Sequence, residues 1–115
     1  MSDNSIDLTV FTELKATTGA EFVAELVDTF IEETPGILTE LRTARSVGDA
    51  ERFRRAAHSL KSNAHAFGAI RLAVLARDLE VNGLDVDHGR DEVTLAALDG
   101  AYLSTAEALK VLCNG

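Results

Sequence analysis

The residues with the clearest chemical potential lie together on one face of a predicted helix. At about 100° per residue, a cluster of polar side chains of the segment 50–67 falls within about 60° of His58. The cluster includes Arg54, Lys61, Ser62 and His65. Leu60 and Phe67 point in the opposite direction, so His58 should face solvent. An exposed neutral imidazole can act as a nucleophile or carry a proton.

The charge around His58 differs in sign from the charge of the whole chain. Residues 51–62 hold four basic side chains against one acidic one, a net +3, whereas the 115-residue chain carries -8. The four are Arg52, Arg54, Arg55 and Lys61. Cations one turn from an imidazole would stabilise a transient anionic group such as a phosphoryl group. The overall acidity argues against nucleic-acid binding, which relies on Lys and Arg.

Other chemistries receive little support from the sequence. His58 and His65 are separated by about 10.5 Å along a helix axis, too far to chelate one metal ion, and we expect no metal site. The sequence has no glycine-rich phosphate-binding loop, so an ATP-dependent kinase is unsupported and a phosphoryl group would have to come from elsewhere. The single cysteine, Cys113, has no base or orienting group near it in the sequence.

The elements that position His58 are predicted to be helices throughout. Apolar residues recur with helical spacing in one short and four longer segments, and no segment alternates as a strand would. The expected helices cover residues 7–16, 19–46, 49–67, 69–82 and 91–112, with a polar loop over 84–90. We therefore predict an all-α fold, an antiparallel up-down four-helix bundle with a short additional N-terminal helix that caps one end.

Two local features of the first long helix lead to further predictions. Thr18 and Glu21 have the spacing of a capping box, which would place the helix start at Thr18. Its apolar stripe begins at Phe22 and keeps phase across Pro35, which favours one bent helix. Two helices that meet at residues 34–36 are the alternative.

The residues around His58 resemble the signature of histidine phosphotransfer (HPt) domains. The similar stretch reads Ala-His-Ser-Leu-Lys-Ser-Asn-Ala over residues 57–64, followed by Phe-Gly-Ala over 67–69 and Leu72. The similarity extends to Leu75, Leu79 and Glu80 and to the helical layout on both sides. One departure is Ser62, where the family often has glycine. Serine is also small, and its hydroxyl could donate to a phosphoryl oxygen.

The resemblance implies a phosphorelay intermediate rather than an enzyme in the usual sense. His58 would accept a phosphoryl group from a receiver-domain aspartate and pass it to another receiver, with Lys61 stabilising its charge. Arg54, Arg55, Ser62 and His65 are the residues expected to contact the partner. The expected partners are response-regulator receiver domains and a hybrid sensor histidine kinase. The receiver, and not this chain, is expected to supply Mg²⁺.

Length and composition complete the expectations. We predict one domain over residues 1–115, acting as a monomer in the cytoplasm, without a nucleic-acid or membrane partner. No segment reaches the ~18 apolar residues of a membrane span. The rival interpretation is a helical adaptor that binds a partner through a helix face while His58 stays unphosphorylated. Detection of acid-labile, base-stable phosphohistidine would distinguish the two.

Overall fold

The computed structural model describes residues 6–84 and 89–114, and every element in them is a helix. The loop predicted over 84–90 lies largely outside the described residues, because 85–88 are not among them. The helices are α1 (Leu8–Thr18), α2 (Ala20–Val47), α3 (Ala50–Ala66), α4 (Ile70–Asn82) and α5 (Gly89–Asn114). None of the helices in these ranges has both the length and the apolar character that crossing a membrane requires.

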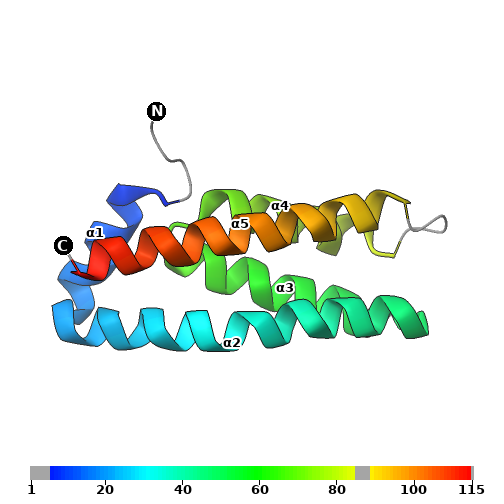
Figure 1. Cartoon of the computed structure of the whole chain (residues 1–115), viewed down its shortest axis with the longest axis horizontal. Helices are drawn as coiled ribbons and strands as arrows, with labels where there is room; N and C mark the ends of the chain where they lie inside the picture. Colours follow the sequence, from blue (N-terminus) through cyan, green and yellow to red (C-terminus); the bar gives the residue numbers. More distant parts are fainter. Residues whose placement is uncertain (1–5, 85–88, 115) are drawn as a thin grey trace.

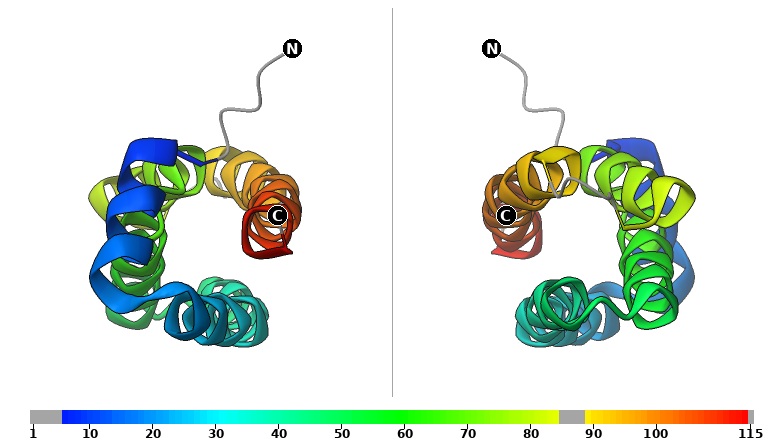
Figure 2. Two further views of the ribbon diagram at one scale, coloured as in Figure 1. Left: turned by 90° about the vertical axis from the view of Figure 1, so that its left-hand side faces the viewer. Right: turned by 90° about the vertical axis from the view of Figure 1, so that its right-hand side faces the viewer.

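The last four helices form the predicted antiparallel bundle. Each runs opposite to the one before it, and α3 and α4 lie side by side, as do α4 and α5 (Figure 1). The end views show the four helices around a common centre, with α5 closing the bundle against α2 (Figure 2). Helix α1 crosses the end of the bundle over α2 and α3, so the predicted position of the short helix is confirmed.

The helix ends follow from residues with the right chemistry for them. Asp49 precedes α3, and its carboxylate accepts a hydrogen bond of 3.1 Å from the backbone N–H of Arg52. Gly68, at φ +75°, turns the chain sharply between α3 and α4. A Cβ at Gly68 would lie 2.8 Å from the backbone oxygen of Asp7. Glycine is therefore required there for two reasons, the positive φ and the lack of space for a side chain. This turn sets how α3 lies against α4.

Two predicted helix starts are wrong. Thr18 is the last residue of α1, and its hydroxyl donates to the carbonyl of Leu14 at 2.9 Å. The residue that caps α2 is Gly19, which has no side chain to contribute, so no capping box forms. Asp91 lies inside α5, which begins at Gly89 rather than at residue 91.

The core is mainly aliphatic, with four buried phenylalanines among the described residues. The predicted stripe of α3 is buried, with Phe53 and Leu60 fully enclosed. Removing such side chains from water is the main term that favours the folded bundle. Phe22 is an exception to the predicted stripe of α2, because half of it is exposed. It lies in the first turn of α2, where the bundle does not cover it.

Helix α2 passes through Pro35 without ending, which confirms the single-helix prediction. Proline has no N–H, so the carbonyl of Ile31, four residues earlier, loses its usual helical donor. Tyr102 of α5 supplies a replacement, because its hydroxyl donates to that carbonyl at 2.7 Å. Burial raises the pKa of this phenol above its usual value. The proline thereby creates a polar link between α2 and α5.

Candidate functional site

His58 lies in the middle of α3 with its imidazole in solvent, where the helical spacing predicted it. Its side chain is 56% exposed, whereas Ala57 and Leu60 beside it are buried in the core. The backbone of α3 is thus fixed by packing while the imidazole itself remains accessible. A partner can reach the ring without disturbing the core.

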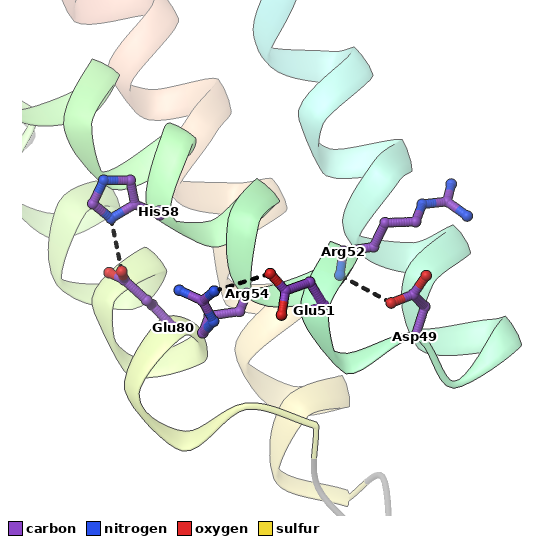
Figure 3. A network of polar contacts seen from close by, with 6 residues as sticks. All are labelled: Asp49, Glu51, Arg52, Arg54, His58 and Glu80. Atoms are coloured by element: carbon purple, nitrogen blue, oxygen red, sulfur yellow. Dashed lines mark hydrogen bonds and ion pairs between the residues drawn. The ribbon is translucent and has the colours of Figure 1, made fainter.

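One nitrogen of the His58 ring is held by Glu80 of α4. The distance from Nδ1 to Oε2 of Glu80 is 2.7 Å, and the contact joins the two neighbouring helices (Figure 3). An ionised carboxylate only accepts hydrogen bonds, so the hydrogen of a neutral His58 lies on Nδ1. The other nitrogen, Nε2, then carries the free lone pair. It lies on the side of the ring away from Glu80.

Lys61 also contacts Glu80, one helical turn after His58. Its Nζ lies 2.8 Å from Oε1 of the carboxylate, so the two oxygens of Glu80 face Lys61 and His58 respectively. The contact with Lys61, and then that with His58, lowers the pKa of Glu80, although partial burial opposes the shift. Glu80 is therefore ionised at neutral pH, as an acceptor of the Nδ1 hydrogen must be.

The positive patch predicted around His58 is largely neutralised by ion pairs. Arg52 reaches Glu40 of α2 with two hydrogen bonds, of 2.7 and 2.9 Å, and lowers the pKa of that carboxyl. Arg54 lies 3.4 Å from Glu51 on its own helix (Figure 3). Within the described ranges, Arg55 is the basic residue of segment 51–62 that makes no ion pair. The charge near the imidazole is consequently smaller than the sequence suggested.

The remaining predicted site residues lie on the exposed surface of α3. Ser62 and His65 are both exposed, one and two turns beyond His58. Neither has a hydrogen bond or ion pair among the residues that the structure describes. They are available to a partner, and their predicted contact with one stays a prediction.

Glu80 is the site residue that sequence reasoning did not assign a role. It was included in the resemblance only as part of the similar stretch. The contact between Glu80 and His58 could have been predicted from the sequence, because α3 and α4 are antiparallel around a tight turn at Gly68. His58 precedes that turn by ten residues and Glu80 follows it by twelve. Side chains at similar distances from such a turn come to face each other.

The donor set around His58 is suited to proton positioning more than to metal binding. Both oxygens of Glu80 already contact nitrogen atoms, and the nearest cation, Lys61, would repel a metal ion. In the part of the chain that the structure describes, no three potential ligands from His, Cys, Asp or Glu gather together. The arrangement holds Nδ1 of His58 and leaves the exposed side of its ring accessible.

The chain is similar to known proteins over most of its length. Residues 25–110 match the family of Hpt domains. The sensor protein TorS of Escherichia coli K12 is 31% identical over 100 residues, which is 85% of this chain but only 11% of TorS. The crystal structure of histidine-containing phosphotransfer protein B of Pseudomonas aeruginosa PAO1 superposes with a TM-score of 0.87. That comparison covers 98% of this chain and 97% of the other, at 25% identity.

A helical bundle that presents an exposed, hydrogen-bonded histidine is the arrangement of a phosphocarrier, and the chain belongs to the Hpt domain family. Its function is histidine phosphotransfer in a phosphorelay.

Proposed function

We propose that His58 is the phosphoryl acceptor and that Nε2 is the reacting atom. The observation that carries this proposal is the hydrogen bond between Nδ1 and Glu80, which leaves Nε2 unprotonated and accessible. In the first step the Nε2 lone pair attacks the phosphorus of an aspartyl phosphate on a receiver domain. The N–P bond forms as the bond from phosphorus to the acyl oxygen breaks, and the aspartate carboxylate leaves with the electron pair.

Glu80 acts in this scheme as a positioning residue. Phosphorylation gives the imidazole a positive charge, and the carboxylate that accepts the Nδ1 hydrogen stabilises that charge. The same contact orients the ring before the reaction, which matters because the donor and acceptor atoms must be nearly in line across the phosphorus. A second receiver aspartate then attacks the phosphorus, and Nε2 leaves with its lone pair restored.

Lys61 is proposed to exchange one anionic partner for another. In the unphosphorylated protein its ammonium is paired with Glu80. A phosphoryl group on Nε2 would compete with that carboxylate for the ammonium and gain a charge-assisted hydrogen bond. Mg²⁺ is assigned to the receiver, because an ion at Glu80 would have to compete with Lys61 and His58 for its oxygens. The proposed partners are receiver domains, including that of a hybrid sensor kinase, and the chain is proposed to act as a monomer.

The test is direct phosphorylation of the purified protein. Incubation with a phosphorylated receiver, or with phosphoramidate as a small donor, should give acid-labile, base-stable label on His58, read by mass spectrometry and by ³¹P NMR. A helical adaptor without phosphotransfer would bind the receiver and take no label. Label that appears on a residue other than His58 would contradict the assigned acceptor.

A further inference from the structure

A groove follows the contact between α2 and α3, beside His58. It consists of two hollows of about 350 and 260 Å³, and Glu33 lines both of them. Ser59, one position after His58, lines the larger hollow, and Asn63, five positions after it, lines the smaller one. At about 100° per residue, Ser59 and Lys61 flank His58 on opposite sides. The groove and the Glu80 contact therefore lie on opposite sides of the imidazole.

The two hollows offer apolar contacts on either side of a carboxylate. The smaller hollow is lined by Leu26 and Phe30, and the larger one by Ile37. Glu33 is exposed, and no ion pair or hydrogen bond involves its side chain within residues 6–84 and 89–114. Glu40, in contrast, lines the same groove but is neutralised by Arg52. Glu33 is thus an unpaired negative charge that the two hollows share. Among the described residues it is the charged side chain that lines the smaller hollow, whereas Arg52 and Arg55 also line the larger one.

The surface between His58 and the groove permits close approach of another protein. Ser59, Ser62 and Ala66 occupy that strip of α3, and all three are small and exposed. Specific interfaces cover roughly 800 Å² on each partner, far more than a single side chain. A receiver whose aspartate reaches Nε2 therefore covers adjacent turns as well. The small side chains of this strip leave room for it beside Arg55, which is exposed one turn before Ser59.

We propose that this groove selects the receiver domain, and that Glu33 favours receivers that present a lysine or arginine next to an apolar side chain. The inference rests on the proposed function, and it adds the chemistry by which one receiver is distinguished from another. The apolar side chain would enter the hollow at Leu26 and Phe30, while the cation pairs with Glu33. Complementary charges across an interface act mainly on association rate and on the choice between partners.

The test measures transfer from a panel of purified receiver domains, each phosphorylated with acetyl phosphate, to the full chain. With the best receiver, Glu33→Lys should lower kcat/KM about five- to tenfold, because attraction becomes repulsion. Glu33→Asp should retain most of the rate. The matched control is Glu32→Lys, which makes the same change of charge at a neighbouring exposed residue that lines neither hollow. The rate of labelling by phosphoramidate does not depend on docking. Each variant's rate with the receiver is divided by its rate with phosphoramidate, which gives a normalised rate.

Several outcomes separate the groove from the reaction itself. A fall in the normalised rate for Glu33→Lys but not for Glu32→Lys supports the groove. So does a Lys→Glu or Arg→Glu change in the receiver that restores transfer to Glu33→Lys. Equal losses for the two variants would show a general effect of charge and overturn the role of Glu33, while phosphotransfer through His58 would stand. If phosphoramidate left the wild-type chain unlabelled on His58, the proposed function and the groove would both fall.

Discussion

Two of the places where polar side chains join neighbouring helices differ in what they leave available for reaction. Between α2 and α5, Tyr102 donates to the carbonyl of Ile31, and Arg42 makes two hydrogen bonds, of 2.7 and 3.2 Å, to Asp99. The Tyr102 hydroxyl and the Arg42–Asp99 pair thereby find partners within the bundle. Between α3 and α4, Glu80 binds one nitrogen of His58 and leaves the other without a partner.

The difference shows how a structural contact becomes a reactive one. A hydrogen bond at one nitrogen of an imidazole fixes the protonation state of the other nitrogen, because the ring is conjugated. A tyrosine or an arginine offers no comparable second site once its donors are used. The α3–α4 contact therefore both joins the helices and prepares a nucleophile, whereas the α2–α5 contacts only stabilise the bundle.

The strongest test of this comparison removes the reactive group. His58→Gln should abolish phosphoryl acceptance from both a receiver and phosphoramidate, because no nucleophilic nitrogen remains. The exposed side chain packs little, so helicity and Tm should change only slightly. Phosphate incorporation measures phosphoryl acceptance, and circular dichroism measures helicity and Tm. The control is His65→Gln on the same exposed face, which should keep most of its activity. Acid-labile label on His58→Gln would refute the assignment.

The next test removes the residue that prepares the nucleophile. Glu80→Ala should slow phosphorylation by roughly tenfold or more, since the ring loses its orientation and its fixed hydrogen. Glu80→Gln should recover part of the rate, because the amide oxygen can still accept from Nδ1. The ¹⁵N chemical shifts of the His58 ring report the tautomer directly. An unchanged tautomer ratio in Glu80→Ala would mean that Glu80 has only a packing role.

Removal of the Lys61 ammonium should have a smaller effect on the transfer rate and should also change the pKa of Glu80. Lys61→Ala should slow transfer about threefold to tenfold, because the phosphoryl charge loses one cation. The same change should raise the pKa of Glu80, since Lys61 is the main cause of its lowered value. With a lowered pKa, Glu80 contributes stability above its unfolded value near 4.5, and this is lost as pH falls through the folded value. A ¹³C titration of the Glu80 carboxyl should therefore move upward in Lys61→Ala, and an unmoved titration would contradict the ion pair.

The smallest effect on phosphotransfer is expected from the α2–α5 contact. Tyr102→Phe removes the hydroxyl that serves Ile31 and should cost about 1 kcal/mol of stability, while transfer rates stay as in the wild type. Burial raises the pKa of Tyr102, so its contribution is complete below pH 10 and is lost as pH rises through the folded pKa. Urea unfolding should show that the difference in free energy of unfolding between the wild type and Tyr102→Phe is smaller above pH 10 than at pH 7. A loss of transfer in Tyr102→Phe would break the distinction between the two contacts.

Much of the fold could be predicted because its signals are local. Helical spacing identified every helix and placed His58 on the exposed face of α3, since periodicity depends only on the residues of one helix. The single helix through Pro35 followed from the uninterrupted stripe. Thr18 was misjudged because a threonine can bond either to the following N–H groups or to a carbonyl four residues back, and here it does the latter.

The rest depends on how the helices pack against one another. The positive patch was overestimated because Arg52 and Lys61 find acidic partners on other helices, Glu40 and Glu80. The same limitation hid the role of Glu80, whose importance comes from a residue 22 positions away. Phe22 keeps phase with the buried stripe of α2, and nothing in its own helix shows that the bundle ends before covering it.

The position of the His58–Glu80 contact in the chain also bears on how the protein folds. His58 and Glu80 are 22 residues apart, whereas Arg42 and Asp99 are 57 apart, and Tyr102 and Ile31 are 71 apart. Closing a shorter loop costs less chain entropy, and local contacts form faster. The hairpin of α3 and α4 can therefore bring the reactive histidine and its carboxylate together before α5 closes the bundle against α2.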